Sequence, residues 1–132
     1  MGIKLRSPIV MASSPITESM QRMEAAVDAG AGALVLKSAC GSVRRGSNDV
    51  RRLKSIPNRG LFMLSTQARE LMGYAESLEL CKKAATSLNV PIIASIGLSE
   101  FDPAQWIKMA KGYEDSGAAA VQIDGYYLPK PW

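Results

Sequence analysis

The sequence predicts an α/β fold of parallel (β/α) units, the N-terminal half of a (β/α)8 or TIM barrel, because one unit occurs twice. The copies span residues 8–37 and 91–124, and each reads as an apolar strand, an amphipathic helix, a glycine and a second apolar strand. Such strands, joined through helices, are typical of parallel sheets. Two copies give four strands, half of the number that closes a barrel. We therefore expect one partial-barrel domain over 1–132, with about four β/α units and a long excursion at about 38–73.

The composition is that of a globular chain, with 132 residues, 47% hydrophobic and 21% charged. No apolar run approaches the ~20 residues of a membrane helix, and the N-terminus lacks the apolar stretch of a signal peptide, so we expect a cytoplasmic protein. The chain contains no histidine and two cysteines, which excludes histidine-dependent nucleophilic mechanisms and predicts no metal site. Cys81 is expected in the core, whereas Cys40 is either a loop thiol or close to a site.

The first unit begins with a strand over 8–13, where three consecutive apolar side chains occur. A helix is expected over about 17–29, because its first residue is a threonine that can act as N-cap and apolar residues repeat at i, i+3 and i+7. A glycine, Gly30 or Gly32, should end this helix. Residues 33–36 are then the second strand.

The excursion at 38–73 breaks this rhythm, because it is polar in its first half and contains several glycines. Loops of this length are often functional, and this one leaves the carboxyl end of a strand. Within it, residues 61–64 are predicted to be a short strand or hairpin arm. Residues 44–59 carry six basic side chains against one acid, which indicates either a docking surface for an anionic ligand or a solvated loop. No aromatic residue lies among these charges, so we expect no nucleic-acid partner.

The second unit follows the same order. A helix is expected over 74–87 and a strand over 92–95. Asp102 is a strong N-cap ahead of a proline, so a third helix should begin there and end at Gly117. The side chains expected to face the core lie on one face of that helix: Ile107, Ala110 and, at its end, Tyr113. Residues 118–123 form the fourth strand.

Side chains able to carry chemistry follow each of the four strands: Ser13, Lys37, Ser95 and Asp124. The carboxyl ends of parallel strands meet at one edge, where such proteins build their sites. Lys37 is the strongest candidate, because a lysine there can hold an anionic ring or a developing negative charge, although it could also extend to solvent. Asp124 could instead cap a helix, and the serines could simply end strands. Dinucleotide and P-loop signatures are absent.

Five segments, in this order, resemble one enzyme superfamily: residues 2–15 with Pro-Ile-Val-Met-Ala-Ser-Ser-Pro, 28–38 with Gly-Ala-Leu-Val-Leu-Lys-Ser, 90–96 with Val-Pro-Ile-Ile-Ala-Ser-Ile, 106–110 and 115–124. The resemblance is to the N-terminal half of the dihydroorotate dehydrogenase superfamily, which consists of FMN-dependent (β/α)8 barrels. It implies an oxidoreductase of pyrimidine metabolism that passes a hydride between a C–H bond of a small anionic substrate and FMN.

The resemblance also implies roles for single residues. Ala12 and Ser13 match positions that approach FMN, and Lys37 and Ser38 match a pair beside flavin and substrate. Ser95 matches a flavin contact at the third strand. Asp124 stands where the family usually has asparagine. Tyr127 occupies the position of the catalytic base, so Lys37 and Tyr127 are the implied catalytic residues. The family's FMN phosphate site lies in the last strands. We therefore expect the chain to need a C-terminal half or to form a homo-oligomer.

Two other functions are open on the residues alone. One is a non-redox, phosphate-binding barrel, a lyase or synthase that uses Lys37. The other is a non-catalytic remnant or interaction module.

Overall fold

The computed structural model describes residues 2–40, 51–55, 62–66, 72–97 and 102–124, and only the backbone of 51–55 and 62–66. The strands that begin and end the two repeated units are β1 (Val10–Met11), β2 (Ala33–Val35), β7 (Ile92–Ile96) and β8 (Ala120–Ile123). β1 pairs with β2, β2 with β7, and β7 with β8, and every pairing is parallel. The expected α/β class with parallel β/α units is confirmed.

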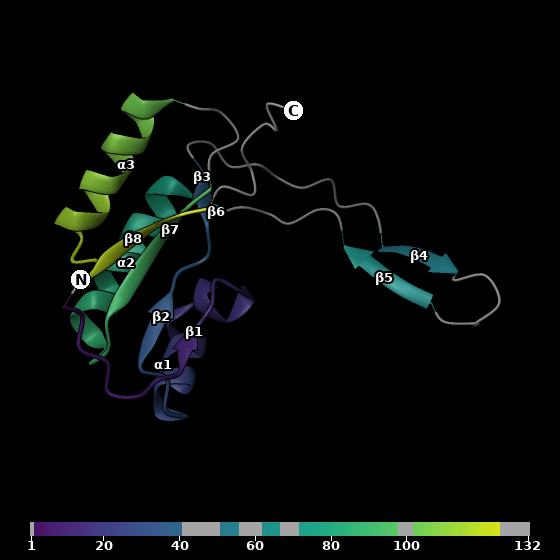
Figure 1. The fold of residues 1–132 in the computed structure, drawn as a ribbon, viewed down its shortest axis with the longest axis horizontal. Helices are drawn as coiled ribbons and strands as arrows, with labels where there is room; N and C mark the ends of the chain where they lie inside the picture. The colour runs from purple at the N-terminus through teal and green to yellow at the C-terminus, as the bar shows by residue number, and fades with distance from the viewer. Residues whose placement is uncertain (1, 41–50, 56–61, 67–71, 98–101, 125–132) are drawn as a thin grey trace.

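Three helices connect these strands and cover the sheet: α1 (Met20–Asp28), α2 (Tyr74–Ser87) and α3 (Pro103–Asp115). Figure 1 shows α2 and α3 alongside β7 and β8. The core between sheet and helices contains Leu34, Ile92 and Ile96 from the strands and Met23 and Tyr113 from the helices, all fully buried. No helix in the described part of the chain is long and apolar enough to cross a membrane.

The first connection differs from the expected helix at 17–29. It contains a 3₁₀ turn, η1 (Pro15–Glu18), and α1 starts only at Met20. The N-cap is Ser14, whose Oγ accepts a hydrogen bond from the Ile16 N–H, while Thr17 Oγ1 accepts from the Ser14 N–H. The expected threonine cap is therefore wrong, because Thr17 is the third residue of a capping box and is fully buried. Gly30 ends α1 with φ 103°, as expected.

The second strand ends at Val35, one residue earlier than expected, and a bulge separates it from a further strand. After β2 the chain continues to β3 (Ala39–Cys40), which pairs with β6 (Met72–Gly73). Val35 is paired with Ile93, and Ala39 is paired with Ile96. The chain therefore advances four residues between these pairs on one side and three residues on β7. The extra residue lies within 36–38, and such bulges redirect side chains near functional sites. Cys40 lies in β3 and is buried, so it is not a loop thiol.

The excursion contains an antiparallel hairpin of β4 (Arg51–Ser55) and β5 (Phe62–Thr66). The strand or hairpin arm expected at 61–64 corresponds to β5, while residue 61 lies outside the described residues. Most of the basic segment 44–59 lies outside the described residues, so neither of its two interpretations is tested.

The second unit follows the sequence closely. α2 has the expected bounds, and Cys81 is fully buried. Asp102 caps α3, since its Oδ1 accepts hydrogen bonds from the next two free backbone N–H groups, 3.0 and 3.2 Å away. The prediction that Ile107 lies in the core is wrong, since its side chain is 56% exposed. Met109 and Tyr113 form the buried face of α3, and a residue two positions before Met109 points away from that face. β8 begins at Ala120 rather than at residue 118.

Candidate functional site

Four strand ends meet at Ser38. Its Oγ lies 2.9 Å from Ser95 Oγ, 3.2 Å from Asp124 Oδ2 and 3.4 Å from Ser13 Oγ. Its backbone N–H also donates to Ser13 Oγ, at 3.1 Å. We call these four residues the serine–aspartate cluster. All four were candidates in the sequence, and the structure brings them together at the carboxyl ends of β1, β2, β7 and β8.

The local fold explains how these side chains meet. Along β7, Ile92, Ala94 and Ile96 belong to the core beneath the helices. Ser95 alternates with them and lies on the opposite face of the sheet, where it is nevertheless fully buried. The bulge before β3 places Ser38, which is 3% exposed, within reach of this serine.

The hydrogen bonds of the cluster have a direction. An ionised carboxylate only accepts, so Ser38 donates its single hydroxyl hydrogen to Asp124. Ser95 Oγ must then donate to Ser38 Oγ. Ser13 Oγ accepts the Ser38 N–H, which leaves the Ser13 hydroxyl hydrogen for Ser38 Oγ or for a ligand. The cluster thus presents one donor, Ser13, and one acceptor, Asp124.

Lys37 lies next to Ser38 in the chain, but its ammonium is paired elsewhere. Nζ lies 3.5 Å from Glu18 Oε1, and the lysine is 8% exposed. A lysine this buried needs an anionic partner, because transfer of an unpaired charge out of water is costly. Glu18 belongs to η1 and was not among the residues predicted for the site. No spacing in the sequence indicates this contact, because the two side chains belong to different connections.

Of the other predicted site residues, Ala12 is not part of these contacts, and Tyr127 is not tested. Ala12 precedes Ser13 and is exposed at the end of β1. Tyr127, the expected catalytic base, lies outside the described residues. Among the residues that are described, no three histidine, cysteine, aspartate or glutamate side chains are grouped as metal ligands would be.

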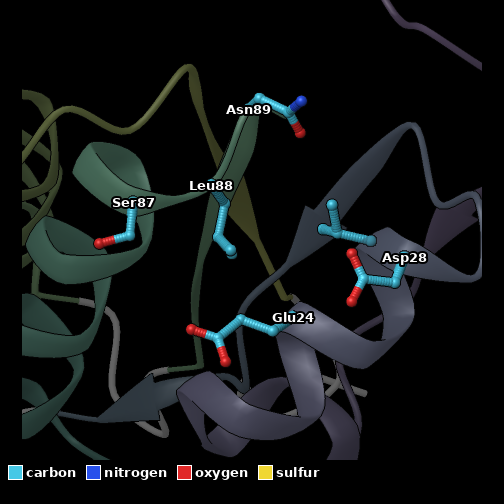
Figure 2. A pocket seen from close by; sticks show the side chains of 6 residues that line it. Glu24, Asp28, Ser87, Leu88 and Asn89 are labelled. Carbon is cyan, nitrogen blue, oxygen red and sulfur yellow. The ribbon is translucent and has the colours of Figure 1, made fainter.

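A hollow of about 410 Å³ lies on another part of the surface (Figure 2), lined by Glu24, Val27, Asp28, Ser87, Leu88 and Asn89. Its residues come from the second half of α1 and from the end of α2. These segments lead into the amino ends of β2 and β7. The hollow is therefore at the opposite end of the sheet from the serine–aspartate cluster and is not part of that site.

The donor set at the strand ends fits the polar edge of a flavin ring. That edge carries carbonyl oxygens and ring nitrogens that accept hydrogen bonds, and one N–H that donates. The Ser13 hydroxyl can serve an acceptor and the Asp124 carboxylate can serve the donor, whereas the Lys37 ammonium can serve an acceptor only after it leaves Glu18. Ala12 and Ser13 have small side chains, which permit a flat ring to approach the backbone.

The chain matches no family model and no curated protein. A function can therefore only be proposed, from the geometry at the strand ends and from the sequence.

Proposed function

We propose that the chain is the N-terminal half of an FMN-dependent (β/α)8 barrel, an oxidoreductase resembling dihydroorotate dehydrogenase. It passes a hydride between a C–H bond of a small anionic substrate and the flavin. One observation carries the proposal: Ser38 contacts residues from the ends of all three other strands of the repeated units. This convergence is what a barrel requires of residues that share a ligand at its carboxyl-terminal face.

The order of the strands supports the barrel. In doubly wound α/β sheets the strand order reverses at a switch point, and ligands bind there. Here β1, β2, β7 and β8 are neighbours in chain order, with a helix in each crossover. A barrel has this order, and its carboxyl-terminal face carries the site.

Each residue has a separate task in the proposed reaction. When bound, FMN supplies the acceptor for the hydride. Lys37 holds the anionic group of the substrate or an acceptor atom of the ring, and Ser13 donates a hydrogen bond beside it. Ser38 orients the Asp124 carboxylate toward an N–H or a proton of the ligand, and the buried Ser95 hydroxyl fixes Ser38.

A lyase or synthase that forms a Schiff base on Lys37 has less support. The nucleophile in that chemistry is the neutral amine. In this structure the Lys37 nitrogen lies 3.5 Å from Glu18 Oε1, in an ion pair that a carbonyl substrate would have to break. Borohydride trapping of a carbonyl compound on Lys37 would favour that alternative.

The flavin proposal is tested by titrating the chain with lumiflavin, which has the ring without the phosphate, and with FMN, while flavin fluorescence is recorded. About 19 non-hydrogen atoms at roughly 0.3 kcal/mol each give about 6 kcal/mol, or a Kd of roughly 50 µM. We expect FMN to bind no more than about threefold more tightly, because the phosphate site belongs to the other half. Ser38→Ala should weaken both ligands, and Ser87→Ala, at the distant hollow, should leave them unchanged.

Two outcomes would contradict the proposal. The chain fails as a flavin-binding half if lumiflavin at 1 mM leaves the fluorescence unchanged, which would favour a non-catalytic module. Stoichiometric FMN on the purified chain would show that the phosphate site is not in a missing half.

A further inference from the structure

The ion pair between Lys37 and Glu18 is unequal. The lysine side chain is 10% exposed and the glutamate side chain 37%. Lys37 has therefore lost most of its hydration, whereas Glu18 keeps a large part. The distance of 3.5 Å between Nζ and Oε1 is longer than the ~2.8 Å of a strong charge-assisted hydrogen bond. Glu18 can consequently return to water at little cost, but Lys37 cannot remain buried without an anion.

The backbone that carries Glu18 is held firmly. η1 is closed by the capping box of Ser14 and Thr17, and Thr17 is fully buried. Arg22 of α1 also donates a hydrogen bond to the Pro15 carbonyl oxygen, at 2.9 Å. A change of partner at Lys37 therefore requires only a rotation of the Glu18 side chain.

The surroundings determine where a competing anion would lie. The Asp124 carboxylate, which accepts a hydrogen bond from Ser38, repels an anion that approaches it. Ser13, which follows β1 in the same connection as Glu18, carries the hydroxyl hydrogen that is not committed to Asp124. An anion that replaced Glu18 would thus be held by the Lys37 ammonium.

We propose that Glu18 is a specificity-determining residue: its carboxylate occupies Lys37 in the free chain and is displaced by the anionic group of the substrate. The proposal rests on the anionic substrate of the proposed function. It adds that exchange of one carboxylate for another keeps the buried ammonium neutralised. A neutral analogue would have to break the ion pair without supplying a charge in its place. It is therefore expected not to bind.

The test uses acetate as the probe and acetamide as its neutral counterpart, with binding followed by NMR at Lys37 Nζ and at the Glu18 carboxylate carbon. Glu18→Gln should bind acetate at least fivefold more tightly than the natural chain, because Lys37 no longer has an internal partner. Glu24→Gln, which removes an exposed carboxylate of α1, is the matched control and should change nothing. Lys37→Gln should abolish acetate binding, and acetamide should not bind.

Equal acetate affinity in Glu18→Gln and the natural chain would overturn the proposal, as would acetate binding that survives Lys37→Gln. If a variant does not fold, the proposal is still tested on the natural chain. The Glu18 carboxylate resonance should shift in parallel with saturation by acetate. A resonance that does not shift overturns the proposal. The result is independent of the lumiflavin titration. If the chain binds no flavin but acetate still displaces Glu18, the proposed cofactor is rejected and the proposed role of Glu18 is retained.

Discussion

Ser38 joins four strand ends through one hydroxyl and one backbone amide. Its Oγ receives the Ser95 hydroxyl and gives its own hydrogen to Asp124, and its N–H is bonded to Ser13. Buried polar groups are nearly always satisfied, and here each satisfies the next. The cluster therefore depends on its central residue more than on any one of the others.

Ser38→Ala should lower the free energy of unfolding by roughly 1–3 kcal/mol. The reason is that the fully buried Ser95 hydroxyl loses its acceptor and cannot reach water. Urea unfolding measures the change. Ser87→Ala, on the exposed last turn of α2, is the control and should stay within about 0.5 kcal/mol of the natural chain. Equal stability of the two variants would show that the Ser95 hydroxyl gains nothing from Ser38.

At this scale the sequence predicted the cluster but not the ion pair. Ser13, Ser95 and Asp124 could be predicted because strand ends are visible as the ends of apolar runs. Glu18 could not, because a contact between side chains of two connections leaves no periodic trace. The Ser14 cap was missed for a related reason: Ser14 and Thr17 both suit an N-cap, and the 3₁₀ turn decides between them.

Among the elements, α2 and α3 pack unusually closely. A Cβ on Gly112 would lie 2.0 Å from Tyr74 Oη, so the helices approach where α3 has no side chain. The rings of Tyr74 and Tyr113 meet edge to face, with centroids 5.6 Å apart. The Tyr113 hydroxyl donates to Ser77 Oγ at 2.8 Å, and both residues are fully buried.

This packing predicts a loss of stability in alkali. Burial raises the pKa of Tyr113 to about 12, against about 10 in the unfolded chain, and burial raises the pKa of Cys81 to about 11 from about 9. Both groups are neutral acids whose folded pKa is raised, so their stabilisation is complete below the unfolded pKa values. It is lost as pH rises from about 9 toward 12, at about 1.4 kcal/mol per pH unit for each titrating group.

Urea unfolding between pH 7 and pH 11 should show a plateau to about pH 8.5 and then a decline. In Tyr113→Phe the decline above pH 10 should be shallower, because one of the buried acids no longer titrates, while Cys81 and Tyr74, whose pKa values are also raised by burial, still contribute. Identical slopes for the variant and the natural chain between pH 10 and pH 11 would exclude Tyr113 as a source of the loss.

Element boundaries were predictable where caps and periodicity agree. The bounds of α2 and the Asp102 cap of α3 follow from the sequence alone. The inward face of α3 does not, since Ile107 and Met109 are both apolar and only packing against the sheet selects the methionine. The bulge at 36–38 was also invisible, because it contains no glycine or proline and appears only in the register against β7.

For the whole molecule, the repeated unit predicted the parallel sheet and the order of its strands. The N-terminal segment was not predicted to have a role, yet it crosses the amino end of the sheet. Ser7 Oγ donates to the Gly30 carbonyl oxygen at 2.7 Å, and the Gly32 N–H donates to the Ile9 carbonyl oxygen at 2.7 Å. Gly32 must be glycine, since a Cβ there would lie 2.1 Å from the Ser7 carbonyl oxygen.

Arg6 fastens this segment to two distant parts of the chain. Its guanidinium donates to the Ala31 carbonyl oxygen at 3.0 Å, to Asn89 Oδ1 at 3.2 Å and to the Val27 carbonyl oxygen. These acceptors lie at the end of α1 and just before β7, so one side chain connects the first repeated unit to the second. A cation is also favoured at the carboxyl end of a helix.

Arg6→Met should therefore destabilise the chain by roughly 1–3 kcal/mol, and Arg6→Lys should recover little of this, because an ammonium lacks the planar fork that reaches three acceptors. Lys4→Met, an exposed change in the same segment with the same loss of charge, is the control. Hydrogen exchange locates the effect: the Gly32 amide should exchange at least tenfold faster in Arg6→Met, because the segment that provides its acceptor opens without Arg6. Unchanged protection at Gly32 would mean that the segment stays in place without Arg6.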